Sequence, residues 1–206
     1  AKAEVAGDKK KRTGHRRGKR DTGVKLRRKI TNAINDESYY LAEQLILSHY
    51  NRLKSTDQPA AFETLYNGAS DLLKAGQGNE GGSLATTLVK EYSESKTTPS
   101  TQLVDGLQTL FALFQKDCVK PRLEFMKEAI KWTAEHGSCP HGDPRLHTDL
   151  ARYHDRRKEY AEAHRHYVRG SRPGDHARCV MEWVRQGYPS ERDLFVTRGV
   201  LECASL

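Results

Sequence analysis

Residues 142–170 read GDPRLHTDLARYHDRRKEYAEAHRHYVRG and contain two short helical patterns in succession. Asp143 and Pro144 are residue types preferred as the N-cap and the first residue of a helix, so a helix is expected to begin there. Apolar residues then follow near the offsets of a tetratricopeptide unit, in which small side chains let two helices touch closely. These residues are Leu150, Ala151, Tyr160, Ala163 and Tyr167. The stretch therefore predicts a helix pair of the kind that stacks into an α-solenoid.

The same helical pattern continues on both sides of this unit. Apolar residues recur at intervals of three and four, and no segment shows the sustained alternation of a β-strand. We expect about ten helices, over residues 26–34, 39–49, 57–76, 81–92, 100–114, 121–137, 143–153, 158–170, 175–187 and 190–203. Ser190 is expected as the N-cap of the last helix, with Asp193 in its first turn. Because the repeat period is not regular, the predicted fold class is all-α, an irregular tetratricopeptide-like α-solenoid.

Positive charge is concentrated near the N-terminus. The 206 residues include 35 Lys+Arg and 27 Asp+Glu, a net charge of +8. Residues 1–30 contain 13 basic and 3 acidic side chains, a net +10, which leaves −2 for the rest. Residues 1–22 have only four apolar side chains, too few to offset the entropy cost of ordering. We therefore predict a disordered basic arm over residues 1–22 and an α-solenoid domain over residues 23–206.

Several classes of protein have no support in the sequence. It has no run of about 20 apolar residues that would indicate a membrane span, and residues 1–20 are too charged for a secretory signal. Phosphate-loop, G-x-S-x-G and H-E-x-x-H motifs are missing from the sequence. Cys139, His141 and His147 lie close together, but their spacing is not that of a zinc site. We expect no enzyme activity, no catalytic residue, no cofactor and no metal.

The basic arm allows three interpretations. Clustered Lys and Arg bind nucleic acid through counterion release, and anionic membranes attract such segments in a similar way. The arm has no aromatic residues among its charges and no apolar face, which weakens both interpretations. We favour a solvated tail that helps to steer an acidic protein partner. A helical-repeat protein that binds nucleic acid through this arm remains the alternative.

The end of a helical stack is where a protein partner is expected to dock, because solenoids present extended surfaces. The predicted helices within residues 24–35 and 39–54 form that end. Lys25, Arg28 and Lys29 would attract an acidic surface there, although a solvated helix face explains the same residues.

Several stretches, in their order and spacing, resemble a known family. They are GDPRLH at 142–147, YAEA at 160–163, HY at 166–167 with Gly170, GYPSE at 187–191, DLFV at 193–196, VL at 200–201 and, more loosely, YYLAEQ at 39–44 and LLKAGQ at 72–77. Together they are similar to the helical-repeat scaffold family of the GET pathway, which guides the entry of tail-anchored membrane proteins. Leu41 stands where this family has Glu.

The resemblance implies a cytosolic adaptor with two protein partners. The family's N-terminal helices bind the targeting ATPase of the pathway and favour its closed, ATP-bound state, which requires that they bind one state better than the other. Its C-terminal helices hold a ubiquitin-like adaptor that connects to a chaperone complex for client handover. Family members continue beyond the residues of this chain, so we expect an N-terminal fragment that lacks most of the adaptor-binding end.

Candidate contacts with the ATPase are placed by position and chemistry, since no motif identifies them. They lie on the first helix pair and near the end of the third helix. They are Lys25, Arg28, Lys29, Tyr39, Tyr40, Asp71 and Lys74.

Overall fold

A computed structural model describes residues 12–204 of the chain, with side chains from Val24 onward except that of Cys203. Its elements are α1 (Arg12–Asn35), α2 (Tyr39–Lys54), α3 (Gln58–Lys74), α4 (Gly78–Glu94), α5 (Thr101–Leu113), α6 (Val119–His136), α7 (Pro144–Arg156), α8 (Tyr160–Tyr167), α9 (Pro173–Gln186), the 3-10 turn η1 (Pro189–Glu191) and α10 (Arg192–Ala204). No strand occurs within this range, and the predicted all-α class is confirmed. None of the described helices is both long enough and apolar enough to cross a membrane.

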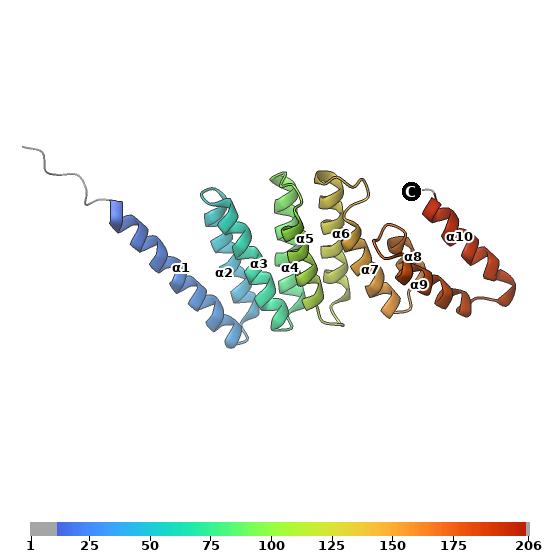
Figure 1. The fold of residues 1–206 in the computed structure, drawn as a ribbon. Helices are drawn as coiled ribbons and strands as arrows, with labels where there is room; N and C mark the ends of the chain where they lie inside the picture. The colour runs from blue at the N-terminus through green and yellow to red at the C-terminus, as the bar shows by residue number, and fades with distance from the viewer. Residues whose placement is uncertain (1–11, 205–206) are drawn as a thin grey trace, which may run out of the picture.

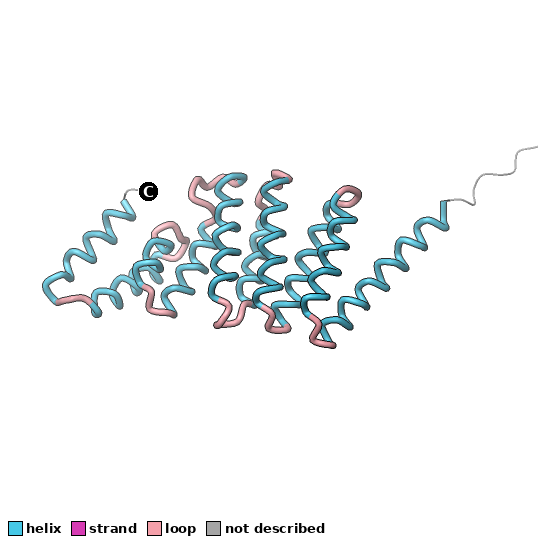
Figure 2. The backbone as a smooth tube through the Cα atoms, turned by 180° about the vertical axis from the view of Figure 1, so that it is seen from behind, coloured by secondary structure: helices cyan, strands magenta, loops and turns pink. Residues whose placement is uncertain are grey.

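The helices form an elongated row of antiparallel neighbours (Figure 1). Helices α2, α4 and α6 pack side by side in one layer, and α3, α5 and α7 form the other. Seen from behind, the short connections lie at the two edges of the row (Figure 2). This arrangement is the predicted irregular α-solenoid.

The core is divided into a large part and a small part. The large cluster runs from α1 to α7 and includes the fully buried Trp132, Phe125 and Leu65. The small cluster joins α7, α8 and α9 through Ala151, Tyr160, Ala163, Tyr167 and Cys179. Most of the predicted tetratricopeptide positions therefore form the second core. The C-terminal helices depend on a much smaller apolar cluster than the rest.

Two predicted helix starts are correct. Asp143 precedes Pro144, and its Oδ1 accepts a hydrogen bond from the backbone N–H of Arg145 at 2.8 Å. Ser100 Oγ accepts from the backbone N–H of Leu103 at 3.3 Å. These local caps can be predicted because a short polar side chain satisfies a free N–H group of the first turn.

Two other predicted starts are wrong. Helix α4 begins at Gly78 rather than at residue 81, because its glycines serve close packing rather than a turn. A Cβ at Gly81 would lie 2.8 Å from Leu73 Cγ, and one at Gly82 would lie 2.8 Å from Pro121 Cβ. Ser190 caps no helix, since Pro189 begins a 3-10 turn ahead of α10.

The predicted arm overlaps the first helix. Residues 1–11 lie outside the described part of the chain. Residues 12–22 form the first turns of α1, which extends beyond the row of packed helices (Figure 1). Disorder of the arm stays a prediction for residues 1–11.

Candidate functional site

Helix α1 presents different chemistry on each of its faces. Ala33 is buried, and Ile30 and Ile34 pack against the large core. Lys25 and Arg28 are exposed and lie roughly opposite that apolar face, as the helical period of 3.6 residues requires. Lys29, also exposed, is four residues after Lys25 on the same face. These three exposed side chains are called the basic stripe below.

A cleft lies on a different side of α1. Its volume is about 370 Å³, and Arg27, Thr31, His49 and Asp71 are among the residues that line it. Arg27 Nη2 also lies 3.7 Å from Glu63 Oε1, an exposed ion pair between α1 and α3. The structure therefore places Asp71 beside Arg27 rather than beside the basic stripe.

His49 contributes little positive charge to this cleft at neutral pH. Burial lowers its pKa, and the nearby positive charges of Arg52 and Arg27 lower it further. Arg27 is thus the main cation among the residues that line the cleft with Asp71.

An apolar pair is exposed where α2 begins. Tyr40 has 72% of its surface exposed and Leu41 53%, whereas Tyr39 is half-buried and packs against the large core. The start of α2 and the end of α3, with Lys74, lie at the same edge of the row because the two helices are antiparallel (Figure 1). Tyr40, Leu41 and Lys74 therefore share this edge.

The seven predicted contact residues thus occupy three positions on α1, α2 and α3. The basic stripe lies along α1, Asp71 lines the cleft, and the edge holds Tyr40 and Lys74 with the half-buried Tyr39. Sequence reasoning missed Arg27 and Leu41. An exposed leucine at the first turn of α2 is visible in the sequence, but the cleft that contains Arg27 depends on how α1 rotates against α3.

The clustered histidines of the second half bind one another instead of converging on one point. His147 Nε2 lies 2.8 Å from the backbone oxygen of His141, to which it donates. Its Nδ1 lies 2.9 Å from His166 Nδ1. Over the described residues, no group of three or more His, Cys, Asp and Glu side chains could hold a metal ion.

Comparison with known proteins gives consistent results. The family model described as Golgi to ER traffic protein 4 matches residues 55–206. The chain is 28% identical over 176 residues to the Golgi to ER traffic protein 4 homolog of Oryzias latipes, covering 84% of this chain and 54% of that protein. It is 27% identical over 209 residues to Protein GET4 of Arabidopsis thaliana, covering 86% and 64%.

A solved structure is also similar. A crystal structure described as C. therm. Get4 matches with a TM-score of 0.79 and 29% identity, over 87% of this chain and 60% of that chain. The chain spans about half the length of the curated relatives it matches. Helices α1 and α2, with most of the predicted contact residues, precede the range that the family model matches.

Proposed function

The chain belongs to the family of Golgi to ER traffic protein 4, and from this premise we propose that it is a GET-pathway scaffold that docks the targeting ATPase on α1, α2 and α3. The family name supports a role in traffic between Golgi and ER. The basic stripe and the exposed residues beside it support this docking surface. We also place this scaffold in the cytosol, where its partners would act.

Unpaired charged side chains at this end of the solenoid support the proposed docking surface. Five charged residues of this surface make no ion pair with any described residue: Lys25, Arg28, Lys29, Asp71 and Lys74. Their charges are therefore free to meet opposite charges on a partner, which raises the rate of association and sets its orientation. Tyr40 and Leu41 add an exposed apolar contact of the kind that anchors an interface.

The preferred nucleotide state follows from linkage. A scaffold that binds the closed, ATP-bound ATPase more tightly than the open one shifts the ATPase toward the closed state. We propose that this chain binds more tightly in ATP than in ADP and slows hydrolysis.

The experiment measures binding of the chain to the ATPase by titration in the presence of a slowly hydrolysed ATP analogue. The double variant Lys25→Glu with Arg28→Glu is expected to bind at least about tenfold more weakly. The matched control is Lys120→Glu with Lys127→Glu, which changes the net charge equally on exposed positions of α6. Unchanged binding by K25E/R28E, or an equal loss in the control, would contradict the proposed surface.

We expect this chain not to bind the second partner, the ubiquitin-like adaptor. About half of the length of the relatives is not matched by this chain, and we propose that the adaptor-binding contact lies in that unmatched part. We expect this chain alone to show no measurable binding to that adaptor. Binding to RNA or DNA that falls steeply with salt, and that disappears when residues 1–22 are deleted, would instead support the nucleic-acid alternative.

A further inference from the structure

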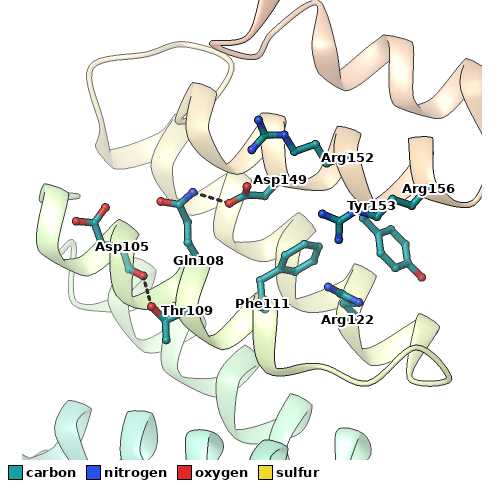
Figure 3. A pocket seen from close by; sticks show the side chains of 10 residues that line it. Asp105, Gln108, Thr109, Phe111, Arg122, Asp149, Arg152, Tyr153 and Arg156 are labelled. Carbon is teal, nitrogen blue, oxygen red and sulfur yellow. Dashed lines mark hydrogen bonds between the residues drawn. The ribbon is translucent and has the colours of Figure 1, made fainter. Parts of the chain in front are cut away.

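A groove opens between α5 and α7, well away from the first three helices. Its volume is about 550 Å³, and Figure 3 shows the side chains that line it. Arg122, Arg156 and Tyr153 lie at one end, Phe111 lies in the middle, and Asp105 lies toward the other end (Figure 3). The lining therefore has a basic half, with Arg122 and Arg156, and another half in which Asp105 and Asp149 share the lining with Arg152.

Arg122 lies in a corner formed by two aromatic rings. Its guanidinium carbon lies 4.3 Å from the ring centre of Phe111 and 4.6 Å from that of Tyr153. The two rings are almost fully buried and meet edge to face, with centres 6.1 Å apart, so the corner restricts the rotation of the arginine side chain. The positive group is thus preorganised, and less conformational entropy is lost when it binds a ligand.

The hydrogen-bonding capacity of this basic half is unused. Arg122 makes no hydrogen bond or ion pair with any described residue, and its Nε is buried without a partner. The hydroxyl group of Tyr153 is also buried without a partner. Arg156 is exposed and forms no ion pair within the described chain. Donors therefore exceed acceptors at this end of the groove.

The nearby carboxylates are engaged elsewhere. Arg152, which also lines the groove, donates to Asp175 Oδ2 at 2.7 Å. Gln108 Nε2 donates to Asp149 Oδ2 at 2.5 Å, and Arg145 pairs with Asp105 at 2.7 Å. Burial lowers the pKa of Arg122, and the positive charge of Arg156 acts in the same direction. An added anion would relieve the repulsion between these two arginines.

We propose that Arg122 and Arg156 form a binding site for a carboxylate side chain from an acidic segment of a protein partner. The planar guanidinium offers two parallel N–H groups that match the two oxygens of a carboxylate. A nucleic-acid base fits less well, because the rings of Phe111 and Tyr153 are almost fully buried and offer no exposed face on which a base could stack. This contact would be additional to the proposed ATPase surface.

The rest of the groove offers less to a ligand. Asp105 and Asp149 line it together with Arg152, but Asp105 is already paired with Arg145 and Asp149 already accepts from Gln108. The ligand is therefore defined by the acidic residue that meets Arg122 and Arg156.

The test uses the full chain and a fluorescent peptide with three consecutive glutamates, with an otherwise identical glutamine peptide as the neutral probe. Binding is measured by anisotropy at low salt. We expect saturable binding of the glutamate peptide only, weakened about tenfold or more by Arg156→Glu and by Arg122→Met. Arg122→Met retains much of the side-chain length beside the two rings, and its folding is checked by circular dichroism.

Matched controls are Lys127→Glu and Lys127→Met on the exposed part of α6, which are expected to bind like the wild type. Arg122→Lys keeps the charge but loses the planar fork, so it is expected to bind more weakly than the wild type. Equal binding of both peptides, or equal losses in the Lys127 and arginine variants, would overturn the proposal. Displacement of the peptide by inorganic phosphate or ATP at lower concentration than by free glutamate peptide would also overturn it, because the site would then prefer a phosphate.

Discussion

His164 Nδ1 lies 2.8 Å from Nε2 of His176, and the other ring nitrogen of His164 lies 2.7 Å from Oε2 of Glu202. A carboxylate accepts, so His164 Nε2 donates to Glu202. This chain of polar contacts joins α8, α9 and α10, where the apolar core is smallest. Contacts between imidazole rings and a carboxylate therefore add to the small apolar core at the C-terminal end.

The first prediction is that acid destabilises the protein below pH 6.5. Burial is the main cause that lowers the pKa of His176 and of His147, and it lowers that of His166 to about 3. The unfolded chain binds protons below pH 6.5 that the folded chain does not, so stability is lost as pH falls. His166 alone is expected to cost about 1.6 kcal/mol between pH 6.5 and pH 5.

Urea denaturation at pH 7.5, 6.5, 5.5 and 5 measures this effect. In the His166→Gln variant the free energy of unfolding should fall less steeply as the pH is lowered. The variant lacks the proton that the unfolded wild-type chain binds at this histidine. A free energy of unfolding that stays constant from pH 7.5 to pH 5 would show that these rings are not held neutral by the fold.

The second prediction concerns the contact between α2 and α3. A Cβ at Gly68 would lie 2.8 Å from both Cδ1 and Cγ2 of Ile46, which is fully buried. Gly68→Ala is expected to cost about 1–3 kcal/mol through overpacking. The double variant Gly68→Ala with Ile46→Ala should lose less free energy of unfolding than the sum of the losses of the two single variants. The smaller side chain at residue 46 makes room for the new methyl group.

Gly174→Ala is the matched control, since a Cβ there meets no atom within 4 Å. It is expected to be neutral or to stabilise α9 by up to about 1 kcal/mol. Thermal melts of all four variants measure the set, and additive losses at residues 46 and 68 would contradict the close contact.

The third prediction compares two N-caps. Asp143 Oδ1 accepts from the backbone N–H of Arg145, and the side chain of Arg145 also pairs with Asp143 Oδ2 at 2.9 Å. Asp57 Oδ1 accepts only a longer bond of 3.2 Å, from the N–H of Ala60. Asp143→Ala is expected to cost about 1–2 kcal/mol and Asp57→Ala about 0.5–1 kcal/mol. Equal losses in urea denaturation would contradict this order.

The fourth prediction concerns the buried indole of Trp132. Its Nε1 donates to the backbone oxygen of Thr97 at 2.9 Å, and its ring lies 5.0 Å from that of Tyr92. Trp132→Phe removes this bond and leaves a carbonyl without its donor, at an expected cost of about 1–3 kcal/mol. Trp183→Phe, at a half-buried ring of the small core, should cost less. Calorimetric melts of both variants decide the order.

Local rules account for much of the fold. Asp143 with Pro144, and Ser100, predict helix starts because capping depends on residues within one turn. The spacing of Ala151, Tyr160 and Ala163 predicts a stacked pair, because the same residues must face inward in any such unit. The all-α solenoid class is therefore readable from the sequence by itself.

Other features were decided only when the helices packed. Gly81 and Gly82 read as a helix boundary, yet they lie inside α4, because their role depends on Leu73 and Pro121 of neighbouring helices. Arg27 and Arg28 are adjacent and chemically identical, but only Arg27 lines the cleft with Asp71.

The groove shows this division most clearly. Phe111, Arg122 and Tyr153 belong to three different helices, and no spacing in the sequence relates them. Secondary structure and fold class follow from interactions within a few residues, which the sequence by itself determines. Which charges pack against aromatic rings, form ion pairs or stay free follows from long-range packing, and only the tertiary structure decides it.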